Sequence, residues 1–305
     1  MTAYRLLTYR SAQGPRAGIA VGDQFADAAE ATGEAAYASV LGILDDWDHA
    51  QPALAQAASR LPNARPLAGV ELLAAVHYPV TIYGAGANYT DHVRRMAEVQ
   101  GIPMEPDPHE LGLKPWHFIK PSRTAVGQDV IVPLRSNAMD WEVELAAVIG
   151  RTARNVSVDN ALDHVAGYTV CNDLSARGLM KRGPVNDLSP FKYDWVGQKC
   201  FDGSCPLGPW IVPASDIADP QALDLRLWVN DTLRQNSNTS KMIFTLAEQI
   251  AHLSTCLTLH PGDVILTGTP NGVGAETGEF LAPGDVVRAE VEGIGMLRTT
   301  IGQPD

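Results

Sequence analysis

Short hydrophobic runs dominate the chain from about Tyr78 onward. Each run is rich in valine, isoleucine and threonine, and glycine, proline, asparagine or aspartate separates it from the next. Such runs predict β-strands, because β-branched residues fit a pleated surface and turn residues end them. The predicted strands are VTIYGAG, HFIKP, DVIVP, VELAAVIG, HVAGYTVCND, GPWIVP, LDLRLWVN, DVILTGTP and DVVRAEVEGIG. These are too many for a doubly wound sheet, so we expect a rolled or sandwiched sheet.

Two segments of this region have helical periodicity instead. They are Thr90–Gln100 and Thr245–Cys256, and the second places apolar residues at i, i+3, i+4 and i+7. The predicted fold class is therefore mostly β with short helices (α+β).

The first seventy residues differ in texture from the rest. YRLLTYR and GIAVGD predict short strands around a Gly-Pro turn, and an Ala-rich stretch over Ala35–Leu61 predicts a helix. Pro62 and Pro66 end that stretch. We expect a small N-terminal α/β domain over residues 1–70 and a β-rich domain over residues 71–305.

Charge and composition restrict the partners. The formal net charge is -12, and 45% of the residues are hydrophobic. An acidic surface repels nucleic acid and anionic membranes, so neither is expected as a partner. An anionic small molecule would then need a local positive centre, such as a metal ion or a few placed Lys and Arg side chains.

Location follows from what the chain lacks. The N-terminus has no apolar stretch of a signal peptide, and no window reaches about 18 uninterrupted apolar residues. The four cysteines do not have the pattern of a disulfide framework or of a common zinc site. We therefore expect a cytoplasmic protein with reduced thiols.

Carboxylates gather just before one predicted strand. Glu142 and Glu144 precede LAAVIG, and alternation along a strand places both side chains on one face, which Asp140 could share. Adjacent buried carboxylates repel each other unless a cation lies between them. Mg²⁺, Mn²⁺ or Ca²⁺ with oxygen ligands resolves that conflict. The alternative is a solvated strand edge.

A further acid ends the strand in GYTVCNDLSAR. Asp173 lies at the end of that apolar run, just before a turn, where it could complete a metal site with Glu142 and Glu144. Its alternative role is a turn or helix N-cap residue.

Three more side chains are candidates for chemistry. His92 lies near a helix start, which favours the neutral form that acts as a base; the alternative is a structural histidine. Lys199 lies among aromatic residues, Gly and Pro, where it could stabilise an enolate or pair with an acid. Thr269 belongs to a Gly-rich turn after a strand, which either binds a carboxylate through backbone N–H groups or is simply tight.

Five motifs, taken together, resemble the fumarylacetoacetate hydrolase superfamily. In chain order they are NYTDH, DWEVE, NDLSAR, KCFDGSCPLGPW and PGDVILTGTPNGVG, and they lie between Val80 and Ile301. The resemblance implies a mixed β-sandwich roll, a homodimer, and Mg²⁺ or Mn²⁺ held by three acids. Carried over by position, those acids are Glu142, Glu144 and Asp173.

The same resemblance implies roles for the other candidates. His92 falls on the general base, Lys199 on the lysine beside the metal, and Thr269, next to Gly268, on the threonine that faces the substrate. Arg177, of the NDLSAR motif, joins them as a substrate-binding candidate. The implied substrates are small 2-oxo or 1,3-dioxo acids, of the kind met in aromatic or sugar-acid catabolism.

The expected reaction is metal-dependent hydrolysis of a C–C bond in an acylpyruvate or 2,4-dioxo acid through an enolate. One alternative is decarboxylation or tautomerisation of an oxo-dicarboxylate on the same site. Another is a metal-binding homologue that has lost activity.

The chain departs from the family pattern beside the histidine. Many members carry a glutamate three residues after it, whereas this chain has Arg95, which stays protonated and cannot orient a base. Arg95 could bind a substrate carboxylate instead. A flexible stretch with several prolines follows and predicts a lid, so Glu98, Glu105 or Glu110 could replace the missing acid.

A second departure follows Asp173. Many members have a glutamine there that contacts substrate, but this chain continues through Arg177 to Met180, which makes the pocket more apolar. Arg182, Lys192 and Tyr193 could supply polar contacts in its place.

Overall fold

A large mixed sheet runs through the computed structural model, which describes residues 4–186 and 188–304. Its strands contain the predicted hydrophobic runs of both parts of the chain. In order they are β4 (Arg65–Pro66), β3 (Gln24–Asp27), β2 (Gly14–Val21), β1 (Arg5–Ser11), β13 (Cys205–Pro213), β11 (Val165–Asn172), β10 (Val143–Ile149), β16 (Val264–Leu266), β5 (Ile82–Ala85) and β6 (His117–Lys120), with β7 (Ala125–Val126) beside β13.

A second sheet packs against the middle of the first. It contains β15 (Thr232–Asn238), β14 (Asp224–Val229), β17 (Val286–Val291), β18 (Gly295–Gly302) and β8 (Ile131–Pro133). Strands β14, β17 and β18 contact β10, β11 and β13, and one hydrophobic cluster fills the space between them. The prediction of a mostly β protein with short helices is confirmed, although β15 and β18 were not predicted.

Burial explains why the central strands read as unbroken hydrophobic runs. Every residue of β10 and β11 is buried, because these strands are covered on both faces. In β17 buried residues alternate with partly exposed ones, as in a strand with one wet face. A short pair, β9 (Met139–Asp140) with β12 (Ser175–Ala176), lies beside the main sheet path.

The two predicted helices of the β-rich part are present. Helix α4 spans Thr90–Gln100, as predicted, and α7 spans Leu246–Cys256. Thr245 caps α7 through a capping box with Glu248, in which each side chain bonds the other residue's backbone N–H. A further short helix, α5 (Val158–Ala161), contacts α7.

The helical stretch predicted over Ala35–Leu61 is present, but it is divided into separate helices. After α1 (Ala28–Thr32), the chain forms a short 3-10 helix and then two helices, α2 (Val40–Asp45) and α3 (Trp47–Arg60). The Ser39 hydroxyl starts α2 by accepting the N–H of Gly42. The spacing of hydrophobic residues does not reveal such a cap, so the sequence pattern did not show where one helix ends and the next begins.

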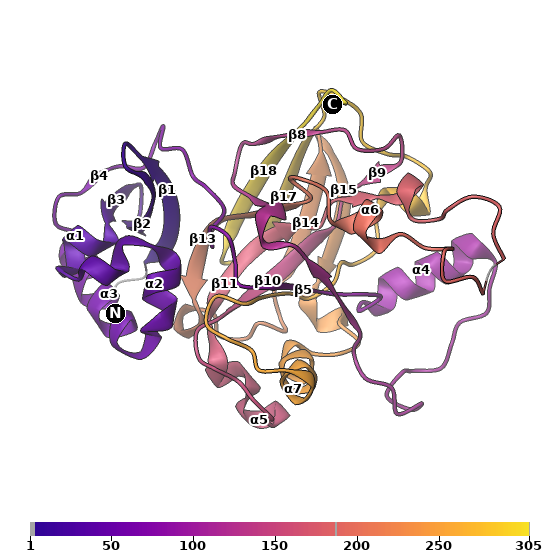
Figure 1. Cartoon of the computed structure of the whole chain (residues 1–305), viewed down its shortest axis with the longest axis horizontal. Helices are drawn as coiled ribbons and strands as arrows, with labels where there is room; N and C mark the ends of the chain where they lie inside the picture. The colour runs from indigo at the N-terminus through magenta and orange to yellow at the C-terminus, as the bar shows by residue number, and fades with distance from the viewer. Residues whose placement is uncertain (1–3, 187, 305) are drawn as a thin grey trace.

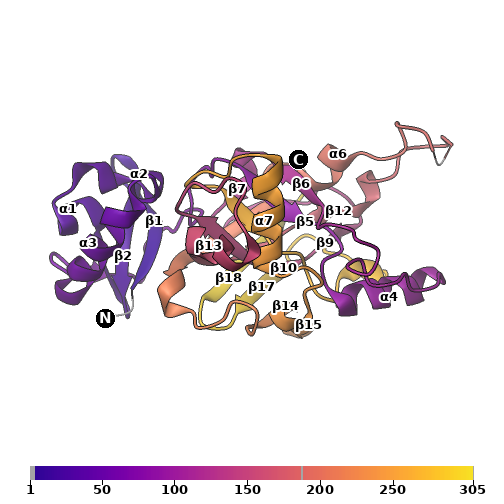
Figure 2. The same cartoon turned by 90° about the horizontal axis from the view of Figure 1, so that it is seen from below.

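The N-terminal elements lie at the opposite end of the molecule from two later helices. Both views place β1–β3 and α1–α3 at one end, and α4 with α6 (Trp195–Lys199) at the other (Figures 1 and 2). Strand β1 pairs with β13, so the first strands extend the main sheet. A domain boundary at residue 70 stays a prediction. Within the described residues, every helix is too short or too polar to cross a bilayer.

Candidate metal centre and active site

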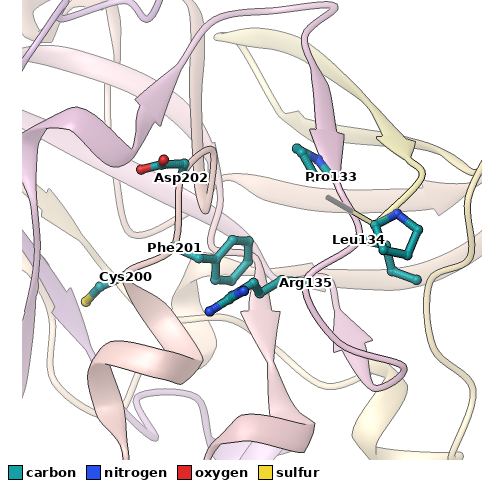
Figure 3. A pocket seen from close by; sticks show the side chains of 7 residues that line it. Pro133, Leu134, Arg135, Cys200, Phe201 and Asp202 are labelled. Atoms are coloured by element: carbon teal, nitrogen blue, oxygen red, sulfur yellow. The ribbon is translucent and has the colours of Figure 1, made fainter.

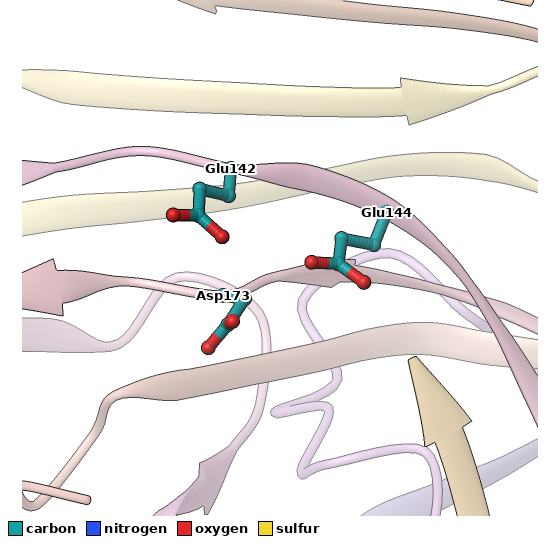
Figure 4. A group of neighbouring side chains, drawn as sticks. All are labelled: Glu142, Glu144 and Asp173. Carbon is teal, nitrogen blue, oxygen red and sulfur yellow. The ribbon is translucent and has the colours of Figure 1, made fainter. Parts of the chain in front are cut away.

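Three buried carboxylates meet where β10 and β11 pair. Glu142 precedes β10, Glu144 lies within it, and Asp173 follows β11. The strand register sets Val143 opposite Asn172, and the Asp173 N–H donates to the Glu142 carbonyl at 2.9 Å. One oxygen from each carboxylate lies within 4.8 Å of the others, and the side chains converge in Figure 4.

Cations surround two of the three carboxylates. Lys199 donates to Glu142 at 2.8 Å and also to Asp173, and Lys120 donates to the other oxygen of Asp173. Arg177 donates to Glu142 at 2.6 Å. Burial alone would raise the pKa of Glu142, but Lys199 and Arg177 outweigh it and lower that pKa to about 2.

Glu144 is the exception. Among the described residues it is the one acid of the three without an ion pair, and it accepts the N–H of Gly268 at 2.6 Å. Burial, and then the charges of Asp173 and Glu142, raise its pKa well above the usual range. A divalent cation among these oxygens would supply the missing positive charge, and carboxylate oxygens are the ligands that Mg²⁺ and Mn²⁺ prefer. The residues present therefore fit a divalent metal.

His92 has an acid partner from a distant part of the chain. Its Nδ1 lies 3.1 Å from Oε1 of Glu276, and the two side chains are 15% and 4% exposed. The other oxygen of Glu276 accepts the N–H of Gly272 at 2.8 Å, which fixes the carboxylate. An acceptor at Nδ1 favours the tautomer that carries its proton there, leaving Nε2 as the basic nitrogen.

The acids expected near His92 lie elsewhere. Arg95 and Glu98 pair with each other at 3.1 Å on the exposed side of α4, while Glu105 and Glu110 are exposed in the segment after that helix. The acid beside His92 is Glu276, in a 3-10 helix (Gly274–Glu276) directly after the Gly-rich turn. In the sequence, the only feature that pointed to Glu276 was its position directly after the Gly-rich turn.

The predicted lid segment is docked on α7. The His109 Nε2 lies 3.0 Å from Glu248, and its ring packs against Phe244 with centroids 4.6 Å apart. Asp107 holds the other ring nitrogen at 3.0 Å. These contacts hold the segment between α4 and β6 against the start of α7.

The Gly-rich turn binds protein groups of the site. Gly268 and Gly272 have φ of 93° and 98°, and a Cβ at Gly272 would lie 2.1 Å from the Arg234 carbonyl oxygen, so both positions favour glycine. The Thr269 hydroxyl donates to the Val143 carbonyl at 2.9 Å. The turn is thereby held against the strand that carries Glu144.

Asp140 lies outside the three-carboxylate cluster. It is fully buried and accepts the N–H groups of Gly274 and Ala275, at 2.6 and 3.0 Å, and the Arg177 guanidinium at 3.0 Å. It therefore connects Arg177 to the helical turn that bears Glu276.

Lys120 is a member of the site that was not predicted. It is fully buried at the end of β6, and Ile119 beside it is 58% exposed. The sequence feature that could have identified Lys120 is the one used for Lys199: a lysine within an apolar run, here HFIKP. Three cations, Lys120, Lys199 and Arg177, thus pair with three buried carboxylates of the site, Glu142, Asp173 and Asp140.

A cavity of about 140 Å³ opens onto this centre. His92, Glu142, Arg177, Lys199 and Thr269 line its polar end, so the structure brings these predicted residues together. Arg95 does not line this cavity and is 45% exposed at its side chain.

A larger cavity, of about 460 Å³, lies beside β8 (Figure 3). Its charged lining residues are Arg135 and Asp202, and Phe201 and Leu134 also line it. The three carboxylates of the cluster do not line this larger cavity, so the cavity is separate from the site described above.

Known proteins are similar to this chain in both sequence and fold. Residues 81–302 match the family model described as Fumarylacetoacetate (FAA) hydrolase C-terminal. Oxaloacetate tautomerase fahd2, mitochondrial, of Xenopus laevis is 39% identical over 236 residues, which cover 76% of this chain and 68% of that protein.

Two solved structures superpose over nearly the whole chain. Maleylpyruvate hydrolase from Sphingobium sp. SYK-6, in complex with manganese (II) ion and pyruvate, has a TM-score of 0.76 and 30% identity, covering 99% of this chain and all of that one. The 2-hydroxyhepta-2,4-diene-1,7-dioate isomerase from Mycobacterium marinum has a TM-score of 0.70 and 28% identity, with 98% of each chain covered. The chain belongs to the fumarylacetoacetate hydrolase family.

Proposed function

We propose that this protein is a divalent-metal-dependent hydrolase that cleaves a C–C bond in an acylpyruvate or related 2,4-dioxo acid. The observation that carries the proposal is the His92–Glu276 pair on the same cavity as Glu142 and Lys199. A base held by a buried acid is what water activation needs, and neither decarboxylation nor tautomerisation requires an activated water.

The metal would be held by Glu142, Glu144 and Asp173. A bound Mg²⁺ or Mn²⁺ would supply Lewis-acid polarisation of the substrate's oxo and carboxylate oxygens. The chain's own residues contribute the rest of the chemistry.

In the first step His92 accepts a proton from water at Nε2, and the water oxygen attacks the C4 carbonyl carbon. Glu276 accepts the hydrogen bond from Nδ1 and stabilises the resulting imidazolium. Fixing the ring in advance lowers the entropic cost of the step.

In the second step the C3–C4 bond breaks. C4 leaves as a carboxylic acid, and C3 keeps the electron pair as the enolate of pyruvate. Two N–H groups of Lys199 already bind Glu142 and Asp173, so its third is available to the enolate oxygen. His92 then returns its proton to C3, which gives pyruvate.

Product analysis tests this proposal. The protein with Mg²⁺ or Mn²⁺ is incubated with acetylpyruvate, and pyruvate and acetate are quantified. Equal amounts of the two, with no reaction after chelation by EDTA, are expected. Failure to cleave both acetylpyruvate and benzoylpyruvate, with either metal at saturating concentration, contradicts the proposal.

A second candidate function has its own support. The relative from Xenopus laevis is named an oxaloacetate tautomerase, and it shares 39% identity with this chain. Oxaloacetate given to the same preparation separates the two functions. Faster keto–enol exchange or carbon dioxide release, without acetylpyruvate cleavage, would favour the tautomerase or decarboxylase.

A further inference from the structure

Aromatic rings form part of the cavity wall, next to its polar residues. Trp116, Phe118 and Trp195, here called the aromatic wall, all line the cavity. Phe118 stacks on Trp195 with centroids 6.1 Å apart, and Trp116 meets Trp195 edge-on at 5.6 Å. Trp116 and Trp195 remain 46% and 43% exposed, so their faces are available to a ligand.

Two glycines allow rings of the aromatic wall to pack directly on the backbone. A Cβ at Gly86 would lie 1.9 Å from the Trp116 ring, and one at Gly84 would lie 2.4 Å from the Phe118 ring. Both rings therefore pack directly on the backbone around the end of β5, where any side chain would displace them. The Gly-Ala-Gly segment of the sequence, which has no other assigned purpose, is explained by this contact.

The aromatic wall begins where the polar end stops. Lys199 Nζ lies 2.8 Å from Glu142 and 5.1 Å from the centroid of Phe118. A ligand whose oxo-acid head lies at the carboxylate cluster would thus extend its tail along the rings.

Cations are confined to the polar end. Within the described part of the chain, the Lys and Arg side chains that line the cavity are Lys199 and Arg177, and carboxylates hold both. The other lining residues include Ala85, Met180 and Gln198, none of which carries a charge that could pair with a second carboxylate. A carboxylate placed there would lose its hydration without a partner.

We propose that the substrate is a 2,4-dioxo acid whose acyl group is flat and apolar, such as an aryl group, rather than one ending in a second carboxylate. The reaction rests on the proposed function, but the recognition of the tail stands on the aromatic wall alone. Aromatic pairs favour offset or edge-on contact and add roughly 2- to 10-fold to affinity beyond simple burial.

Three matched 2-oxo acids test the recognition without turnover. They are 2-oxopentanoate, 2-oxoglutarate and 2-oxo-4-phenylbutanoate, which carry a methyl, a carboxylate and a phenyl group beyond the same head. Titration calorimetry in Mg²⁺ gives each dissociation constant. The phenyl compound is expected to bind at least fivefold more tightly than the methyl compound, and 2-oxoglutarate no more tightly than the methyl compound.

Variants assign the preference to the wall. Trp116→Ala and Trp195→Ala should each reduce the phenyl-to-methyl affinity ratio at least threefold, while Trp116→Phe keeps most of it. Two alanine variants on different elements guard against one that fails to fold. Phe191→Ala is the matched control, because Phe191 is 67% exposed and lies outside the cavity lining.

The outcomes separate the two proposals. An affinity ratio below fivefold, a ratio unchanged in both alanine variants, or 2-oxoglutarate binding as tightly as the phenyl compound overturns the inference. If benzoylpyruvate and acetylpyruvate both resist cleavage while the ratio holds, the hydrolase fails and the recognition stands. If acetylpyruvate is cleaved and the ratio is absent, the hydrolase stands and the recognition fails.

Discussion

The metal end and the base end of the cavity are built in different ways. Glu142, Glu144 and Asp173 come from two neighbouring strands, and their meeting follows from a hydrogen-bonded register. His92 and Glu276 are 184 residues apart and meet through a helix and a turn. The first arrangement depends on backbone pairing, while the second depends on one side-chain contact, so substitutions should affect them differently.

Removing the unpaired charge at the metal end should have the largest effect. Glu144→Gln keeps the shape but removes a ligand charge, so we expect metal affinity and turnover to fall by on the order of 10²-fold or more. The metal-free variant should be more stable, by about 1 kcal/mol, because the buried amide needs no protonation to become neutral, whereas the Glu144 carboxylate with its raised pKa does. Calorimetry with Mn²⁺ and urea unfolding measure the two. Unchanged metal binding would refute the assignment of Glu144 as a ligand.

The base end should lose rate without losing metal. His92→Ala is expected to lower kcat by about 10²- to 10⁴-fold, the usual contribution of a general base. The dissociation constant for Mn²⁺ should stay within about threefold, because the hydrogen-bond partner of His92 is Glu276 and not a carboxylate of the cluster. A rate near that of the unmodified protein would remove His92 from the mechanism.

The pairing of the base is tested by two glutamates. Glu276→Gln should lower kcat about 10- to 100-fold, since the amide cannot stabilise the imidazolium that the carboxylate supports. Glu98→Gln serves as the control, because Glu98 pairs with Arg95 on the surface. Steady-state kinetics on acetylpyruvate compare them. Equal losses in both variants, or a loss only in Glu98→Gln, would argue against Glu276 as the acid that supports His92 and would assign part of that role to Glu98 on α4.

The smallest expected effect lies beside the aromatic wall, on stability rather than rate. Burial lowers the pKa of His117, on β6, to about 4, so the folded protein holds this ring neutral. As pH falls from about 6.5 to 4, the unfolded chain gains a proton that the folded one does not, and up to about 3 kcal/mol of stability is lost. His117→Gln should flatten that part of the unfolding free energy against pH.

A His117→Gln curve that parallels the unmodified one between pH 4 and 6.5 would argue against this role of burial.

Sequence reasoning succeeded where geometry is local. Alternation along a strand was enough to pair Glu142 with Glu144, and the run ending in Asn172 placed Asp173 at a strand end. Most strands of the β-rich part, and its helices α4 and α7, followed from hydrophobic spacing for the same reason.

Contacts between distant segments were missed for a physical reason. Nothing local distinguishes Glu276 from other acids in turns, because its partner His92 is brought to it only when α4 packs near the Gly-rich turn. Lys120 reaches Asp173 across 53 residues in the same way. The aromatic wall was also missed, since two of its rings pack on glycines that the sequence placed only in the predicted strand VTIYGAG.

The edge strand β6 carries an evolutionary constraint. Phe118 and Lys120 lie two residues apart and share the face turned to the site, where one ring belongs to the aromatic wall and the ammonium binds Asp173. Inserting or deleting one residue before them would turn both away together and present Ile119 in their place. Descendants of this chain can therefore exchange Phe118 for another ring and so change substrate, but they cannot slide the strand to do so.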